Sequence, residues 1–348
     1  MLTASPGCIE CGRCARACPV TTLRGFEDFP GPRTLAVDAP RFGKELSSLR
    51  SDLEKCTTCW RCEDVCPSRI PLVDLILDAR RELYSLEGLP SGHRRILENI
   101  DAYQRAVTPA KERGPVVKAS AAKLLYFPGC IAEERLPAIR SSTTAMLSSS
   151  GHEFRFAEGW SCCGAPLEKI GDQRRLQKVK EENLKAFDGY ETLVTSCPGC
   201  LTQFVRSYKI DALHTLEFLK ESVSPVKLQF RSSKTRLRVA LQQPCHLART
   251  IGPHAIDYSY QLLQRVPGLK LVEIDEPSRC CGGGGGVVAG HPDIALSLAQ
   301  AKVRSALDAK ADIIVAPCPF CVTNLGRAGG LPVQDLVEFL ASHMSDRK

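Results

Sequence analysis

The sequence has 348 residues and a formal net charge of +7, from 46 Lys and Arg against 39 Asp and Glu. Hydrophobic residues make up 43% of it and charged residues 24%, which is ordinary for a globular protein and excludes a disordered or fibrous chain. It has no run of about 18 apolar residues and no N-terminal signal pattern, so we expect neither a membrane-spanning helix nor secretion. These features predict a cytoplasmic protein of about two or three domains.

The 18 cysteines are the most unusual feature of the composition. A disulfide framework is typical of short secreted chains, but this chain is long and places its cysteines in tight clusters. We therefore interpret them as metal ligands in a reducing compartment. Metal-bound thiols are deprotonated, so the excess of basic residues compensates for the charge of the bound groups. No arginine stripe interleaved with aromatic residues indicates nucleic-acid binding.

Residues 1–117 contain two cysteine quartets with the same spacing, C-x₂-C-x₂-C-x₃-C-P. Two-cluster ferredoxins have this spacing, in which three thiolates bind one [4Fe–4S] cluster and the fourth crosses to the other cluster. A zinc ribbon would use pairs of cysteines rather than quartets that end in Cys-Pro. The predicted ligand sets are Cys8, Cys11, Cys14 and Cys66 for one cubane cluster, and Cys18, Cys56, Cys59 and Cys62 for the other.

Leucines around the second quartet recur at a helical period, at Leu46, Leu49 and Leu53 before it and at Leu72 and Leu83 after it. We therefore predict an all-α dicluster ferredoxin domain over residues 1–117, which ends in a helical linker. The segments Phe29-Pro30-Gly31-Pro32-Arg33 and Arg41-Phe42 resemble the helical iron–sulfur domain of succinate dehydrogenase and fumarate reductase B subunits.

Residues 118–348 contain one arrangement twice: a single cysteine, an adjacent cysteine pair followed by glycine, and a Cys-Pro-x-Cys. Apolar segments at 124–127, 192–195, 238–241 and 312–316 alternate with helical stretches, which predicts a duplicated α/β unit with parallel strands, over 118–230 and 231–348. Parallel sheets bind ligands at the carboxyl ends of their strands, where these cysteines fall. Frame 1 is Cys130, Cys162, Cys163, Cys197 and Cys200, and frame 2 is Cys245, Cys280, Cys281, Cys318 and Cys321.

Five glycines, Gly282 to Gly286, follow the cysteine pair of frame 2. Glycine has no Cβ and tolerates positive φ, so this run suits a backbone that wraps closely around something bulky. A phosphate loop would need Gly-Lys-Ser/Thr, and a dinucleotide fingerprint would need an acidic residue about 20 positions later. We therefore do not favour nucleotide binding.

The spacing of each frame, with Pro244-Cys245-His246-Leu247, Val266-Pro267-Gly268 and the glycine run, resembles the CCG domain. In the B- and D-type subunits of heterodisulfide reductase, the catalytic form of that domain binds a noncubane [4Fe–4S] cluster. A helical ferredoxin domain followed by two CCG domains resembles the D-type subunit, which is a natural fusion of the C and B subunits. Gln243 stands where an aspartate is usual in the family.

The resemblance implies an oxidoreductase that acts on a disulfide. Electrons would pass from two cubane clusters to a noncubane cluster in each frame, and a mixed disulfide of coenzyme M and coenzyme B, as in methanogenesis, would be cleaved between the frames. Catalysis would rest on the ten frame cysteines. The implied partners are a small-molecule disulfide and an electron-donating subunit, either a membrane cytochrome b or a flavoprotein, through which the chain would associate with a membrane.

Several alternatives remain open. The chain is also similar to electron-transfer iron–sulfur subunits of flavin dehydrogenases that oxidise glycerol-3-phosphate, glycolate or lactate, and to thiol:fumarate reductase B subunits. A zinc-structured scaffold is a third interpretation. His246 would hydrogen bond a cluster sulfur or deliver a proton to a departing thiolate, unless it is simply packed. Arg279, beside Cys280, is a candidate for binding an anionic substrate.

Overall fold

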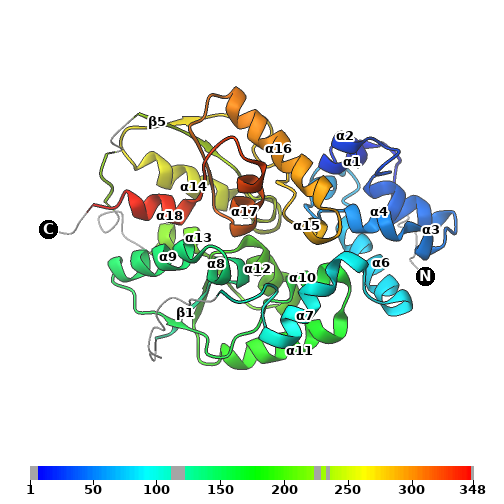
Figure 1. Ribbon diagram of the computed structural model, residues 1–348, viewed down its shortest axis with the longest axis horizontal. Coiled ribbons are helices and arrows are strands. Elements are labelled where there is room, and N and C mark those ends of the chain that lie inside the picture. Colours follow the sequence, from blue (N-terminus) through cyan, green and yellow to red (C-terminus); the bar gives the residue numbers. More distant parts are fainter. Residues whose placement is uncertain (1–6, 111–121, 223–228, 233–235, 346–348) are drawn as a thin grey trace.

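The computed structural model describes residues 7–110, 122–222, 229–232 and 236–345. Its N-terminal part, at the right in Figure 1, is helical throughout the described range and lies against two α/β units. The all-α prediction for this domain is therefore confirmed. Its helices are α1 (Arg13–Arg16), α2 (Pro19–Arg24), η1 (Thr34–Asp38), α3 (Ala39–Arg41), η2 (Leu46–Leu49), α4 (Arg50–Lys55), α5 (Arg61–Asp64), α6 (Leu72–Glu87), η3 (Ser91–His93) and α7 (Arg94–Tyr103).

The longest helix of this domain, α6, forms where the leucine period predicted a helix. It buries one face against the domain core and ends at Gly88, whose positive φ of 75° stops the helical path. The core is completed by side chains from the C-terminal part of the chain, including Val287, Ile294 and Leu298. The helical domain and the second α/β unit therefore share one hydrophobic core. None of the helices in the described ranges combines the length and the hydrophobicity that a bilayer crossing requires.

Unit 1 is a four-stranded parallel sheet in the order β2-β1-β3-β4, flanked by helices. Its central strand β1 is buried along its whole length, which is typical of a parallel sheet covered on both faces. The elements are β1 (Leu124–Phe127), α8 (Cys130–Glu134), α9 (Pro137–Ser149), β2 (Arg155–Phe156), α10 (Ala165–Ile170), α11 (Gln173–Ala186), β3 (Thr192–Thr195), α12 (Pro198–Gln203), η4 (Phe204–Tyr208), β4 (Leu213–His214) and α13 (Thr215–Ser222).

Unit 2 repeats this sheet as β6-β5-β7-β8, again with parallel strands, so the predicted duplicated α/β fold is confirmed. Every frame cysteine follows the carboxyl end of a strand, as expected for a ligand site of such sheets. The elements are β5 (Leu237–Leu241), η6 (Leu247–Ile251), α14 (Pro253–Gln264), β6 (Leu269–Val272), α15 (Val287–Gly290), α16 (Pro292–Asp308), β7 (Ile313–Ala316), α17 (Pro319–Ala328), β8 (Val333–Asp335) and α18 (Leu336–Ser342).

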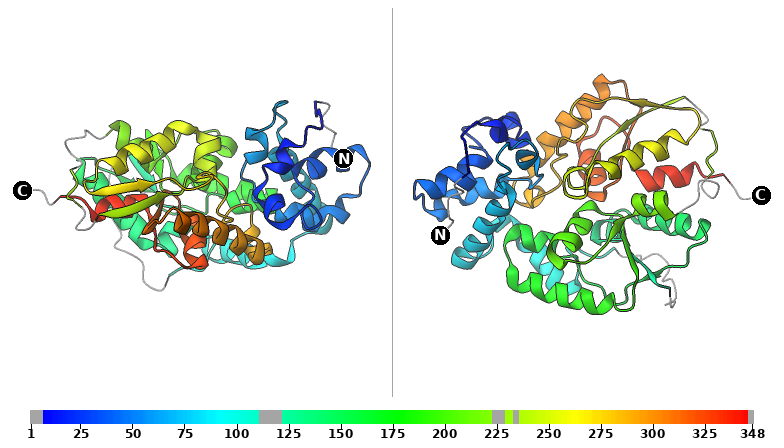
Figure 2. Two further views of the ribbon diagram at one scale, coloured as in Figure 1. Left: turned by 90° about the horizontal axis from the view of Figure 1, so that it is seen from above. Right: turned by 180° about the vertical axis from the view of Figure 1, so that it is seen from behind.

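The two units pack through matching helices, with α13 against α14 and α9 against α18. The view from behind shows the units side by side, with the helical domain against both (Figure 2). Helix α6 contacts α10 of unit 1, while α2 and α4 contact α16 and α15 of unit 2. The helical domain thus lies at the end of the interface between the units.

The fourth strand of each unit ends in a side chain that caps the following helix. Asp335 accepts a hydrogen bond from the backbone N–H of Val337 at 2.8 Å, and His214 Nδ1 accepts one from Leu216 at 3.3 Å. Both side chains are buried. His214 therefore has a structural role at the start of helix α13.

The glycine run of unit 2 lies at the contact with the helical domain. A Cβ on Gly284 would lie 2.9 Å from the carbonyl oxygen of Thr57, and one on Gly285 would lie 2.3 Å from that of Cys56. Gly285 also has a φ of +68°. A Cβ on Gly286 would lie 2.7 Å from Nε2 of His93. These glycines therefore allow one backbone to pack directly on another, since any side chain would hold the two domains apart.

We predict that Gly285→Ala weakens this domain contact. The added methyl group overlaps the backbone at Cys56 and Thr57 and must adopt a left-handed φ, so we expect a loss of at least about 2 kcal/mol in the free energy of unfolding. Urea denaturation, followed by circular dichroism, would measure it. The matched control is Gly326→Ala on the exposed side of helix α17, where no atom lies within 4 Å and a gain of about 1 kcal/mol is expected. Equal effects of the two substitutions would contradict the interpretation.

A second prediction concerns Asp335, because burial raises the pKa of this carboxyl to about 7. The unfolded chain, with a pKa near 3.9, loses its proton first as the pH rises, so stability falls between about pH 4 and pH 7 and is constant above. Asp335→Asn keeps the capping acceptor but does not ionise. We expect the variant to be about 2–4 kcal/mol more stable than the parent at pH 8, with a smaller difference at pH 5. A difference that does not vary with pH in parallel denaturation curves would refute this.

Candidate metal centres

The two cysteine loops of the helical domain follow the same unusual backbone path. Glu10 and Gly12 in the first loop, and Thr58 and Trp60 in the second, have positive φ values of 56°, 72°, 49° and 59°. Such values are unfavourable for a β-branched or bulky residue and persist only where surroundings impose them. Alternating left-handed residues turn successive N–H groups toward one side, which makes a cradle for an anionic group. The Thr58 N–H, for example, lies 3.4 Å from Cys56 Sγ.

The structure brings together the thiols of each predicted cubane site, with the fourth thiol contributed by the other loop. Cys66 from the second loop lines one cavity with Cys8, Cys11 and Cys14. Cys11 is exposed, so this site lies at the surface. Cys18 from the first loop lies among the second set: burial, followed by the proximity of Cys59, raises the pKa of the Cys18 thiol to about 12.

The five thiols of frame 1 also converge, and all are buried. Cys130 contacts Cys162, Cys163 contacts both Cys162 and Cys200, and Cys200 contacts Cys197. The hydrogen bonds from Cys162 and Cys200 lower the pKa of Cys163 to about 6. Cys163 is therefore ready to bind a metal as a thiolate.

Frame 2 repeats this arrangement. Cys281 Sγ lies 3.2 Å from Cys321 Sγ, and hydrogen bonds from Cys280 and Cys321 hold the pKa of Cys281 well below its usual value. Cys245 contacts Cys280, and Cys318 contacts Cys321. In each frame the second cysteine of the pair is thus the thiol most stabilised as an anion.

The local structure around each frame follows from its prolines and from a buried amide. Pro198 and Pro319 start α12 and α17 directly after the first cysteine of each Cys-Pro-x-Cys, a position where the missing N–H costs nothing. Asn183 on α11 holds the loop of the first pair, since it accepts from Ser161 N at 2.8 Å and donates to the Cys162 carbonyl at 3.1 Å. Asn324 on α17 donates to the Cys281 carbonyl at 2.6 Å and to the Ala295 carbonyl at 3.0 Å.

Among the residues that the structure describes, frame 2 rather than frame 1 touches a predicted cubane ligand. Cys59 hydrogen bonds Cys280, and the two form one buried group with Cys245. Arg249 on η6 fastens this contact: it donates to the carbonyl oxygens of Cys59 at 3.2 Å and Ser278 at 2.9 Å. The cysteine loops of two domains are therefore in direct contact.

Trp60, between Cys59 and Cys62, lies at the junction of all three parts of the chain. His246 of unit 2 packs edge-on against its ring at 5.0 Å. Two cations of unit 1, Lys169 and Arg206, lie 5.4 and 5.2 Å from the ring centroid. Local sequence patterns do not predict this arrangement, because its four residues come from four separate segments in three parts of the chain. Only the position of Trp60 within the cluster-loop spacing could have drawn attention to it.

The two other candidate residues, His246 and Arg279, lie in different surroundings from each other. His246 Nδ1 lies 3.5 Å from Cys245 Sγ, and burial, with nearby cations, lowers the pKa of His246 to about 3. At neutral pH the ring is therefore uncharged and would need a proton from elsewhere before it could deliver one. Arg279 donates to Thr22 at 2.9 Å and pairs with Glu276 at 3.2 Å, so it ties unit 2 to the helical domain.

The donor sets fit iron–sulfur clusters. Each set consists of thiols, the soft ligands that such clusters use, and all 18 cysteines are free of disulfides. Within the described ranges, no group of three or more His, Cys, Asp or Glu side chains forms a ready shell for a single metal ion. Backbone N–H groups lie near the sulfurs, such as Ala106 N at 3.5 Å from Cys130 and Gly282 N at 3.3 Å from Cys280.

Comparison with known proteins identifies one protein family in the helical domain and another in both α/β units. Residues 5–70 match the 4Fe-4S dicluster domain family, and residues 124–205 and 239–326 match the cysteine-rich (CCG) domain family. The chain is 31% identical to the D subunit of the dihydromethanophenazine:CoB–CoM heterodisulfide reductase of Methanosarcina acetivorans, over 96% of this chain and 92% of that protein.

Two further relatives have other names. The B subunit of the fumarate reductase (CoM/CoB) of Methanothermobacter marburgensis is 29% identical over 98% of this chain and 72% of its own length. The glycolate oxidase iron–sulfur subunit of Escherichia coli is 25% identical over 96% of this chain and 92% of its own length. The shared arrangement of domains thus occurs in proteins whose names point to different reactions.

We predict that Asn183→Ala destabilises the loop of frame 1. It leaves the buried Ser161 N–H and Cys162 carbonyl without partners, which should lower the free energy of unfolding by about 2–3 kcal/mol. Chemical denaturation would measure the loss. The control is Gln177→Ala on the exposed face of the same helix, expected within about 0.5 kcal/mol of the parent. A loss no larger than that of the control would argue against the assigned role.

Proposed function

We propose that this chain, which belongs to the family of iron–sulfur proteins that includes the D subunits of heterodisulfide reductase, reductively cleaves a mixed disulfide of the coenzyme M–coenzyme B type. It is an iron–sulfur oxidoreductase subunit, in which electrons would enter the helical domain and reach the frames. The contact between Cys59 and Cys280 carries the proposal, because it links the two kinds of site directly.

Each set of thiols would hold one iron–sulfur cluster. The two quartets, Cys8, Cys11, Cys14 and Cys66, and Cys18, Cys56, Cys59 and Cys62, would hold cubane clusters, and frames 1 and 2 would each hold a noncubane cluster. When bound, these groups would carry electrons one at a time and supply the reducing power at the frames. The overall reaction takes up two electrons and two protons and converts one disulfide into two thiols. The protein chain would hold the bound groups in position, keep water away from them and surround them with charged side chains.

The packing of the two units supports a substrate site between the frames. Helix α12, which carries Cys200, packs against η6, which follows Cys245. The hydroxyls of Thr202 and Thr250 meet across this contact at 2.7 Å. Since each frame lies at the carboxyl edge of its own sheet, a disulfide between them would have one sulfur near each frame.

The cations at Trp60 support an anionic substrate. Lys169 is only 8% exposed and pairs with Glu168 at 3.0 Å, and Arg206, beside the same ring, pairs with Asp74 at 2.7 Å. Fixed positive charges in a partly dry site attract anionic groups and hold them in place. We prefer these residues to Arg279 as candidates for substrate binding because they lie at the junction of the three parts of the chain.

The surface near the first quartet is our candidate for the electron-donating partner. Cys11 is exposed there, and Ile9 in the same loop is 66% exposed. Arg13 and Arg16 line a hollow with Cys66 beside this loop. An exposed apolar residue next to a cluster ligand suits a contact across which electrons pass. A membrane cytochrome b or a flavoprotein would provide the electrons.

The alternative function is electron transfer without disulfide chemistry, with a flavin dehydrogenase or a thiol:fumarate reductase as the partner. The similarity to the glycolate oxidase protein over nearly the whole chain supports it. Two complete frames of five thiols that both converge support disulfide cleavage, because a simple carrier needs fewer ligands.

We expect the anaerobically reconstituted full chain to bind about 16 irons and to give a new paramagnetic iron signal when coenzyme M is added. Electron paramagnetic resonance (EPR) with iron and sulfide analysis would test this. Cys321→Ser in frame 2 should abolish the new signal and lower the iron content by about four, while the cubane signals remain.

The matched control is Ser342→Ala, whose side chain lies away from every cysteine set and which should change neither the signal nor the iron content. An iron-replete parent with an unchanged spectrum would favour the carrier alternative. A colourless, zinc-loaded preparation would refute both functions.

A further inference from the structure

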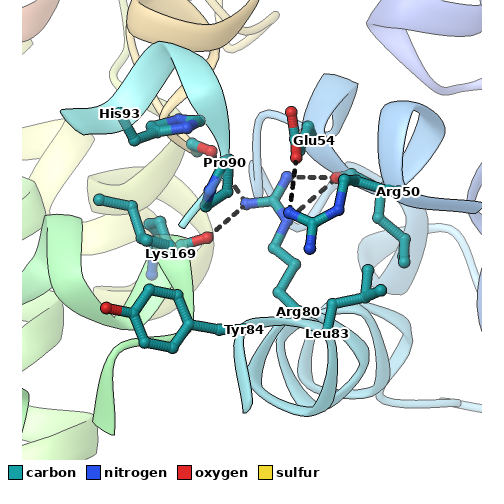
Figure 3. A pocket seen from close by; sticks show the side chains of 11 residues that line it. Arg50, Glu54, Arg80, Leu83, Tyr84, Pro90, His93 and Lys169 are labelled. Atoms are coloured by element: carbon teal, nitrogen blue, oxygen red, sulfur yellow. Dashed lines mark hydrogen bonds and ion pairs between the residues drawn. The ribbon is translucent and has the colours of Figure 1, made fainter. Parts of the chain in front are cut away.

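Arg80 on α6 joins the three parts of the chain at one point (Figure 3). The side chain is buried, with 4% exposed. Nε and Nη2 both donate to the carbonyl oxygen of Leu53, and Nη2 also donates to that of Cys56 at 2.7 Å. Nη1 donates to the carbonyl oxygens of Lys169 in unit 1 at 3.0 Å and Gly285 in unit 2 at 2.9 Å. All five N–H groups of the guanidinium are thus used on backbone oxygens.

Arg80 has no ion-pair partner among the residues that the structure describes. The nearby carboxylate of Glu54 instead lies 3.6 Å from Arg50 and 3.8 Å from His291. Burial lowers the pKa of Arg80, whereas the thiolate of Cys56 and, after it, the carboxylate of Glu54 raise it, and an arginine side chain stays charged in proteins. A buried cation without a carboxylate is costly unless another negative group compensates for it.

The cluster predicted at Cys56 is the negative group that this position faces. A cubane with four thiolates carries about −2 when oxidised and about −3 after it accepts one electron. The backbone of Cys56 is bonded to the guanidinium, and the Cys56 thiol lies within its field. A fixed positive charge in a dry site stabilises the more negative state of a neighbour more strongly than the less negative one.

We propose that Arg80 is a positioning residue that also raises the reduction potential of the cluster at Cys18, Cys56, Cys59 and Cys62. One electron from the partner, or from dithionite in a test, would then collect on this cluster, next to frame 2. The inference rests on the proposed function, because it requires a cubane cluster in each quartet.

The first quartet also has cations beside it, but those described there are exposed or paired: Arg16 donates to the Cys11 carbonyl oxygen at 2.8 Å in an exposed contact. Arg33 lines its cavity, but this side chain pairs with Asp38 at 3.0 Å. Cys11 at this site is exposed, so water screens nearby charges. The two cubane sites therefore differ in their surroundings although their cysteine spacing is the same.

The test is an EPR-monitored titration of the reconstituted full chain with dithionite. In Arg80→Gln, at a fixed potential, the ratio of reduced to oxidised cluster should fall about tenfold for one cubane signal, equivalent to about 59 mV for one electron. The other cubane signal should not move. Arg80→Lys keeps the charge and should stay within about threefold of the parent. Arg50→Gln, which removes a neighbouring arginine already paired with Glu87 at 2.8 Å, is the matched control and should leave both signals unchanged.

A second measurement uses the unsubstituted protein, so it does not depend on a variant that folds. A soluble paramagnetic ion such as a dysprosium chelate broadens the signal of the exposed cluster first, and this assigns the two signals. We expect the unbroadened, buried cluster to be reduced at the higher potential. The inference is overturned if the exposed cluster is reduced first, or if Arg80→Gln lowers stability while both potentials stay in place. Absence of cubane signals would refute the proposed function itself.

Discussion

The contact between two stretches of bare backbone determines how the rest of this protein is arranged. Gly284 and Gly285 of unit 2 lie directly on the backbone of Cys56 and Thr57, and Arg80 binds carbonyl oxygens from both sides of the contact. No side chain separates the two segments. Cys59 and Cys280 lie only a few residues along the chain from this contact, so they are brought against each other. The closeness of Cys59 and Cys280 thus follows from glycine geometry rather than from any attraction between thiols.

The duplicated units share one fold but differ in what the glycines after the cysteine pair contact. Both have the same strand order and the same five thiols, and in both a side chain at the end of the fourth strand caps a helix. They differ after the cysteine pair. Gly164 of unit 1 has a positive φ, and a Cβ there would lie 2.5 Å from Leu176 of its own unit. The longer glycine run of unit 2 faces another domain instead, so the extra glycines belong to docking rather than to the frame.

The sequence predicted the parts of the structure that depend on local patterns. Cysteine spacing, the leucine period and apolar strands such as 124–127 led to the fold class, which the structure confirms. The strands β4 and β8 were missed because runs as short as Leu213–His214 carry no alternation. The π-helical turns η4 and η6 were missed as well. Arg80 could not be predicted, since its acceptors lie in segments far apart in the sequence. The glycine run was expected to wrap around a bulky group, whereas it packs on another backbone.

Some of the basic residues are buried beside the cysteine sets. Lys169 and Arg80 are buried around the second quartet and frame 2, as is the side chain of Arg249, and they come from unit 1, the helical domain and unit 2. In the proposed function, each electron that arrived would add negative charge to a region with little water, where charge is costly. Because the compensating cations are contributed by three separate parts of the chain, the favourable field exists only when all three are assembled. Under the proposed function, the fold would therefore couple correct domain docking to the capacity to accept electrons.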